Sequence, residues 1–124
     1  MENYLTYRDV KAYKIAFELS NYVWEIVMRW DGFAKRTIGS QFVNSTDSIS
    51  ANIAEGFGRH FKKEKVNFYR YSRGSAMEAS DWNQKAQKRN LMTIGQYEHI
   101  KGELDKLPKE INNLIYYTSI KLKV

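Results

Sequence analysis

The chain has 124 residues, of which 43% are hydrophobic and 15% aromatic, and its formal net charge at pH 7 is +6. This length and apolar content are enough for one domain with one core, and they exclude a disordered tail. One proline and seven glycines leave few residues for the tight turns of an all-β domain, so we expect an all-α chain.

The sequence contains no cysteine. Disulfide frameworks, thiolate zinc sites, iron–sulfur clusters and cysteine nucleophiles are therefore excluded. The first residues include an acid and no apolar stretch of signal-peptide length. No apolar run approaches the roughly 18 residues that a membrane span needs. We expect a soluble, cytoplasmic protein.

The first helical pattern begins after Asp9, which we expect to be its N-cap, and extends for about 20 residues. Large residues recur at spacings of three and four, so they share one face of the helix. The residues predicted on that face are Val10, Tyr13, Phe17, Ser20, Val23, Trp24, Val27 and Trp30. Asp31 and Gly32 are expected to end the helix, with the glycine in the left-handed conformation.

The second pattern runs from about Thr37 to Glu55, and Gly56 and Gly58 are expected to mark its end. The third runs from near Lys63 to about Asn90. Each again has an apolar face with helical spacing.

Thr93 is expected to cap the fourth helix, whose apolar face continues to Leu122. Pro108 lies inside this pattern and removes one backbone donor, so we expect one helix with a kink or short break around residues 104–107. Four amphipathic helices with short polar connections predict a single domain over residues 1–124. Its expected architecture is an up-down-up-down four-helix bundle.

Two segments place small and polar residues where the helical period predicts large apolar ones. Their members are Ser48, Asn52, Glu55 and Gly56 on the second helix and Gly74, Ser75 and Glu78 on the third. Small residues allow two backbones to approach, and polar ones can then form hydrogen bonds across the gap. We favour a structural network that fixes the register of these two helices. The alternative is a site in which Glu55 and Glu78 bind a metal or perform acid–base chemistry.

Residue spacing argues against the metal and catalytic alternatives. Di-iron bundles use Glu-x-x-His, whereas His60 and His99 are preceded at that spacing by Phe57 and Gln96. A nucleophile elbow and a phosphate-binding glycine-rich loop are also missing from the sequence. We therefore predict no enzymatic activity, no bound metal and no cofactor.

The two segments carry a resemblance. Asn52-Ile53-Ala54-Glu55-Gly56, followed by Arg59 and by Gly74-Ser75-x-x-Glu78, resembles the signature of small four-helix bundle proteins encoded in intervening sequences of bacterial 23S ribosomal RNA genes. The same fold family includes the accessory protein of diversity-generating retroelements, which partners a reverse transcriptase. The resemblance implies a ring-shaped homopentamer with a basic surface. It also implies nucleic-acid binding rather than enzymatic activity.

Positive charge is concentrated in residues 59–73, which contain six basic residues and one acid, a balance of +5. Residues 1–31, in contrast, sum to −1. The basic residues of the tract are Arg59, Lys62, Lys63, Lys65, Arg70 and Arg73, and the rings interleaved with them are His60, Phe61, Phe68, Tyr69 and Tyr71. Such aromatic residues stack on unpaired bases in some proteins and belong to the core in others. A patch repeated around a ring would bind a polyanion by avidity.

A second basic group, Lys85, Lys88 and Arg89, closes the third helix, and we interpret it as a complement to the helix dipole. Lys121 and Lys123 are expected to do the same for the fourth helix.

These patterns predict a non-enzymatic, oligomeric protein that binds RNA or DNA through its basic tract, as an accessory to a nucleic-acid enzyme. The alternative is a protein-interaction scaffold that docks an acidic partner. In that case exposed aromatic residues of the first helix, such as Tyr22 or Trp24, would form subunit or partner contacts.

Overall fold

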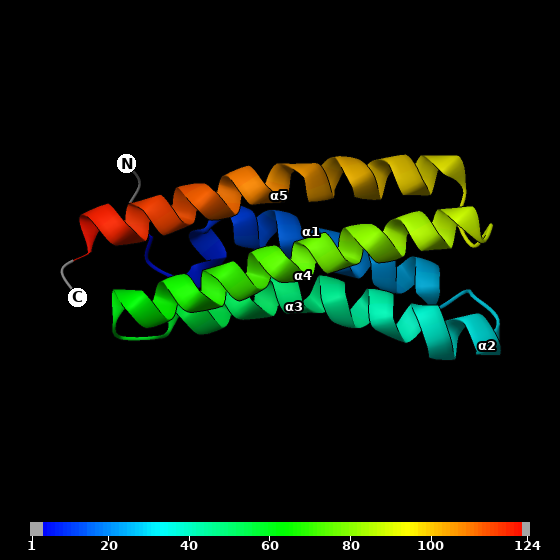
Figure 1. The fold of residues 1–124 in the computed structure, drawn as a ribbon, viewed down its shortest axis with the longest axis horizontal. Helices are drawn as coiled ribbons and strands as arrows, with labels where there is room; N and C mark the ends of the chain where they lie inside the picture. The colour runs from blue at the N-terminus through cyan, green and yellow to red at the C-terminus, as the bar shows by residue number, and fades with distance from the viewer. Residues whose placement is uncertain (1–3, 123–124) are drawn as a thin grey trace.

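The computed structural model describes residues 4–122, and four long helices lie side by side in it (Figure 1). They are α1 (Lys11–Val27), α3 (Ser40–Phe57), α4 (Lys62–Lys88) and α5 (Ile94–Lys121). A 3-10 turn, η1 (Tyr7–Asp9), precedes α1, while a short helix, α2 (Gly32–Ala34), and a π-helical turn, η2 (Lys35–Gly39), lead into α3. The described part of the chain contains no strand, so the predicted all-α four-helix bundle is confirmed.

The four long helices form a closed square in which neighbours in sequence are neighbours in space. α3 packs between α1 and α4, and α5 packs between α4 and α1. Their directions alternate along the chain, as the colours of Figure 1 show. This is the up-down-up-down arrangement that short connections favour. None of the described helices is long and apolar enough to cross a membrane.

The start of α1 differs from the prediction. The N-cap residue is Val10, and the Asp9 carboxylate instead accepts hydrogen bonds from the amides of Leu5 and Thr6, each at 2.9 Å. Asp9 therefore completes a capping box around the 3-10 turn that precedes α1. The prediction of Asp9 as the helix cap was wrong by one residue, because this extra turn uses its carboxylate.

The buried face of α1 is displaced around the helix from the predicted one. It is centred on Ala12, Ala16, Leu19 and Val23, all at most 1% exposed. The small alanines let α1 approach its neighbours closely, and the bulky rings lie beside this seam rather than in it. Phe17 and Trp24, expected on the apolar face, are 46% and 49% exposed.

Asp31 does not end α1, which already stops at Val27. Its carboxylate accepts a hydrogen bond from the Ala34 amide at 3.0 Å and so caps α2. Gly32 is the first residue of α2, and no described glycine has a positive φ. The Asp31-Gly32 pair therefore begins the next helical segment, since an aspartate can cap an N-terminus as readily as it can follow a C-terminus.

Helix α3 continues past the predicted end at Glu55. Gly56 lies within the helix and is buried, and Gly58 is the C-cap residue. A Cβ atom at Gly56 would stand 2.8 Å from Tyr69 Cε1 and 3.0 Å from the carbonyl oxygen of Lys65. Glycine is needed here because the backbone of α4 crosses α3 at this point.

Helix α4 ends close to the predicted boundary, in a Schellman motif. Asn90 has a φ of 59°, the Leu91 amide donates to the Ala86 carbonyl at 2.9 Å, and the Asn90 amide donates to the Gln87 carbonyl. Asparagine is one of the few residues that tolerate this left-handed position.

The Asn90 position gives a first prediction. Asn90→Ala is expected to lower the free energy of unfolding by about 1 kcal/mol, because alanine pays the full cost of the left-handed conformation. Asn90→Gly is expected to be at least as stable as the wild type. Urea denaturation of the three proteins measures the order. An alanine variant as stable as the glycine variant would contradict the prediction.

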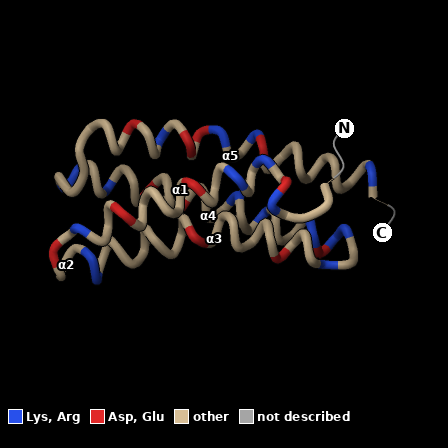
Figure 2. The backbone as a smooth tube through the Cα atoms, turned by 180° about the vertical axis from the view of Figure 1, so that it is seen from behind, with Lys and Arg blue, Asp and Glu red and all other residues tan. Residues whose placement is uncertain are grey.

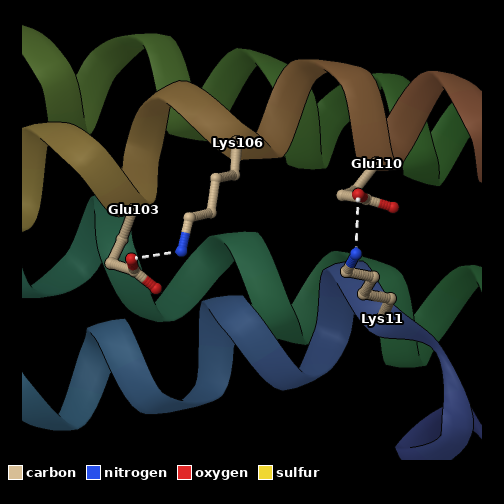
Figure 3. A network of polar contacts seen from close by, with 4 residues as sticks. All are labelled: Lys11, Glu103, Lys106 and Glu110. Atoms are coloured by element: carbon tan, nitrogen blue, oxygen red, sulfur yellow. Dashed lines mark hydrogen bonds and ion pairs between the residues drawn. The ribbon is translucent and has the colours of Figure 1, made fainter.

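Helix α5 begins as predicted, with Thr93 and Gln96 forming a capping box. It continues through Pro108 as one helix, as predicted, and has no break at residues 104–107 (Figure 1). Lys11 of α1 and Glu110 of α5 point toward one another, 3.4 Å apart, and tie the first helix to the last (Figure 3).

Candidate nucleic-acid interface

Four of the six basic residues of the tract lie along the side of α4 that faces α5. Lys62 donates to the Ser119 carbonyl at 3.1 Å, and Arg73 donates to Asn112 Oδ1. Arg70 lies on the same side, because positions 62, 66, 70 and 73 repeat at helical spacing. Lys62, Lys63, Val66, Arg70 and Ser119 line one shallow depression. We call Lys62, Lys63, Arg70 and Arg73 the α4/α5 strip.

The α4/α5 strip carries positive charge that no described acid neutralises. Among residues 4–122, none of its four members forms an ion pair. Its four members are spread over residues 62–73, which correspond to about 16 Å of helix, enough to follow several phosphates of one strand. Two lysines of α5 differ in this respect, because Lys106 pairs with Glu103 (Figure 3) and Lys101 pairs with Asp105. Figure 2 shows the strip's end of the bundle, where blue segments gather at the α3–α4 connection.

The other two basic residues of the tract, Arg59 and Lys65, bind partners within the chain. Arg59 lies 2.9 Å from the Glu55 carboxylate and 3.9 Å from that of Glu64, and its guanidinium covers the ring of Phe68. Lys65 donates to the Phe57 carbonyl at 2.7 Å, and burial lowers the pKa of its ammonium. The tract of six therefore does not form a single patch.

The aromatic residues of the tract do not lie along the strip. Tyr69 is 1% exposed and belongs to the core. Phe68 and Tyr71 pack edge to face, with ring centroids 5.5 Å apart, on the opposite side of α4, where Arg59 covers Phe68. Phe61, at the N-cap of α4, is exposed and packs against His60.

The polar residues of the two small-polar segments bond within their own helices. Ser48 donates to the Asn44 carbonyl, Asn52 to the Ser48 carbonyl, and Glu78 accepts from the Trp82 indole. The expected hydrogen bonds across the two helices were wrong for these residues, because each finds a partner one turn away. The side-chain bonds that do cross from α4 to α3 come from other residues. Ser72 Oγ donates to the Ile49 carbonyl at 2.7 Å in the buried interior, and Lys65 donates to the Phe57 carbonyl.

The small residues of these segments also differ from one another. Gly56 is a point of close helix contact, as described above, whereas a Cβ at Gly74 would meet no atom within 4 Å. Ser75 is half-buried, and Glu55 and Glu78 are exposed. Within residues 4–122, no three His, Asp or Glu side chains gather in a way that could hold a metal ion.

Two surface features were missed in the sequence. The first is an open cleft at the far end of the bundle, lined by Phe33, Arg36, Thr37, Ile38, Gln41, Trp82, Lys85 and Arg89. Lys85 and Arg89, interpreted as dipole complements, thus share a surface with Arg36 from the segment before α3. Only the antiparallel packing of α3 and α4 brings these residues together, so no local pattern could have revealed the cleft.

The second feature is a cavity of about 240 Å³ at the end of the bundle where the α3–α4 connection meets the last turns of α5. Its lining comes from the chain start, α3, the α3–α4 connection, α4 and α5. The residues are Tyr4, Phe57, His60, Lys65, Tyr69, Leu114, Tyr117, Thr118 and Leu122. Its rings are scattered over more than 100 residues of sequence and form no motif.

An apolar stripe on the outside of α1 is also exposed. Phe17, Trp24 and Met28 are each about half exposed, and Tyr13 stacks on Phe17 with ring centroids 5.9 Å apart. Tyr22, which was expected to be exposed together with Trp24, is half-buried against His99.

These features define the class of this protein: a small antiparallel four-helix bundle with an unneutralised basic strip on one face. The family model described as the 23S rRNA-intervening sequence protein matches residues 8–113, and the chain belongs to this family. This confirms the resemblance drawn from the two small-polar segments. Comparison with curated proteins finds no match.

Proposed function

We propose that this protein is a non-enzymatic homo-oligomer that binds RNA or DNA through the α4/α5 strip, as an accessory to a nucleic-acid enzyme. The observation that carries the proposal is the strip itself, with four cations on one side of a helix and no described acid paired to them. Phosphate contacts of this kind supply most of the affinity in sequence-independent binding. The family description names an intervening sequence of ribosomal RNA, which fits a role close to nucleic acid.

Repetition of the strip in an oligomer would strengthen a weak contact. The ring-shaped homopentamer comes from the resemblance, and in such a ring one polyanion would meet several strips at once. The exposed stripe of Phe17, Trp24 and Met28 on α1 supports association, because monomeric proteins rarely leave aromatic residues grouped in water.

The test is a double charge reversal, Lys63→Glu with Arg70→Glu, since within residues 4–122 neither side chain has a hydrogen bond or ion pair that the fold would lose. Affinity for a structured RNA and for single-stranded DNA is measured by fluorescence anisotropy from about 50 to about 200 mM salt. We expect wild-type binding that weakens with salt, and a loss of about tenfold or more in the variant at low salt.

The control is Lys14→Glu with Arg29→Glu, in and just after α1, which changes the net charge by the same amount on another part of the bundle. We expect this control to lose far less affinity than the strip variant. An equal loss would show that only the net charge matters. Failure of the wild type to bind at low salt would overturn the proposal.

The second candidate is a protein-interaction scaffold, which the exposed apolar stripe on α1 favours. In this role the basic strip would dock an acidic protein. Capture experiments on lysate with and without nuclease separate the two functions. A partner that is retained after nuclease treatment, together with no direct binding of RNA or DNA, would favour the scaffold.

A further inference from the structure

The cavity beside the α3–α4 connection has the composition of a binding site for a single flat ring. Its walls are largely aromatic, with Tyr4, Phe57, Tyr69 and Tyr117 contributing rings. Tyr4 and Tyr117 meet edge to face, with centroids 5.1 Å apart. Its volume of about 240 Å³ is below the roughly 300–1,000 Å³ of sites that hold drug-sized molecules, so it suits one ring system.

A few polar groups converge on these apolar walls. The Lys65 ammonium has three N–H donors, and its one hydrogen bond among the described residues goes to the Phe57 carbonyl at 2.7 Å. Two donors therefore remain for an acceptor on a ligand. Thr118 and His60 add a hydroxyl and an imidazole to the lining. An apolar pocket with a small number of placed polar groups is typical of specific small-ring recognition.

The cavity lies next to the α4/α5 strip. Thr118 lines the cavity, and the following residue, Ser119, accepts the hydrogen bond from Lys62 of the strip. Lys65 lines the cavity from α4, while Lys62 and Lys63, just before it in the first turn of the helix, line the depression of the strip. A strand whose phosphates follow the strip would therefore arrive at the cavity.

We propose that this cavity takes one unpaired nucleobase of a single strand whose phosphates lie on the α4/α5 strip. The proposal rests on the proposed function and makes it more specific. A base inside a duplex is stacked and paired and has no free face to offer, whereas a base in a single strand stacks readily on aromatic side chains. The ligand is then single-stranded RNA or DNA, and the protein holds it by both backbone and base.

The first arm of the test uses the wild-type protein and two fluorescent probes. One probe is a single strand of about 16 nucleotides of mixed sequence, and the other is a strand of the same length made of abasic sites. Because both carry the same phosphates, the difference between them reports on the bases. Stacking of one base on aromatic residues typically changes affinity by about 5- to 150-fold, so we expect the abasic strand to bind at least about fivefold more weakly.

The second arm uses Tyr117→Leu, which removes a ring from the cavity wall but keeps an apolar side chain there. The matched control is Tyr71→Leu, an exposed tyrosine on the opposite side of α4. We expect Tyr117→Leu to weaken binding of the base-bearing strand about fivefold or more and to leave the abasic strand unchanged. Tyr71→Leu should change neither. Thermal unfolding by circular dichroism checks that both variants remain folded.

The possible outcomes distinguish the base pocket from the proposed function. Equal binding of the two strands by the wild type would overturn the base pocket and leave the proposed function intact. An equal effect of Tyr117→Leu on both strands would also overturn the pocket, because the ring would then not act through a base. Failure of both strands to bind at low salt would overturn the proposed function and the pocket together.

Discussion

Gly56→Ala is expected to lower the free energy of unfolding by about 1–2 kcal/mol, although alanine is the better helix former. The new methyl group would stand 2.8 Å from Tyr69 Cε1, 2.9 Å from Phe68 Cβ and 3.0 Å from the Lys65 carbonyl oxygen. Forcing an extra carbon into a packed site costs about 1–3 kcal/mol, and three contacts at 3.0 Å or less, one of them to a backbone oxygen, place this substitution in the upper half of that range. Alanine recovers about 1 kcal/mol through its helix propensity, which is not enough to offset that cost.

The same motif supplies the control. A Cβ at Gly74 would have no atom within 4 Å, and the residue lies exposed within α4. Gly74→Ala is therefore expected to raise stability by about 0.5–1 kcal/mol. Urea denaturation of both variants measures the two changes. If both substitutions moved stability in the same direction, the close approach of α3 and α4 at Gly56 would not control it.

The stability of the wild type is expected to fall by about 2 kcal/mol between pH 10 and pH 12 because of Tyr69. Burial raises the pKa of its phenol to about 12, a rise that the hydrogen bond with Thr118 only partly opposes. In the unfolded chain the phenol titrates near pH 10. Between these two values the unfolded state has lost the proton and the folded state still holds it, so unfolding becomes easier as pH rises.

Tyr69→Phe isolates this effect. At neutral pH the variant is expected to be less stable than the wild type by about 1 kcal/mol, because the hydrogen bond with Thr118 is lost. Near pH 12 the order should reverse, because phenylalanine has no proton to lose. Denaturation curves at a series of pH values measure the crossover, and Tyr71→Phe, at an exposed position on α4, should follow the wild type. Parallel wild-type and Tyr69→Phe stabilities from pH 7 to pH 12 would contradict the assignment.

Much of the fold could be predicted because helix formation is governed by local patterns. The Thr93–Gln96 capping box, the end of α4 near Asn90 and the continuation of α5 to Lys121 follow from residues within one or two turns. The errors occurred at two aspartates, because an aspartate beside a helix boundary can bond the amides of either of two adjacent segments. Asp9 completes a capping box and Asp31 is an N-cap, but each belongs to a segment other than the expected one. Their carboxylates bond amides within four residues, and the sequence does not show which amides are free.

The candidate interface could be predicted only in part. The tract 59–73 was visible as a charge imbalance, but Lys62 and Arg73 reach α5 while Arg59 and Lys65 turn to other partners. Helical spacing predicts which residues share a side of α4, but it does not predict which side of α4 packs against α5. No sequence pattern indicated the cavity, because the residues that line it are spread along the chain from Tyr4 to Leu122.

Local patterns of residues were enough to predict four amphipathic helices, the absence of thiol chemistry, and a concentration of positive charge between residues 59 and 73. The sequence also showed the family through the two small-polar segments. The packing of the four helices, in contrast, determines which cations align as a strip, which rings line the cavity and which aromatic residues of α1 stay exposed to solvent. The physical reason is that helical periodicity acts over three or four residues, whereas the partner of Lys62 lies 57 residues away along the chain.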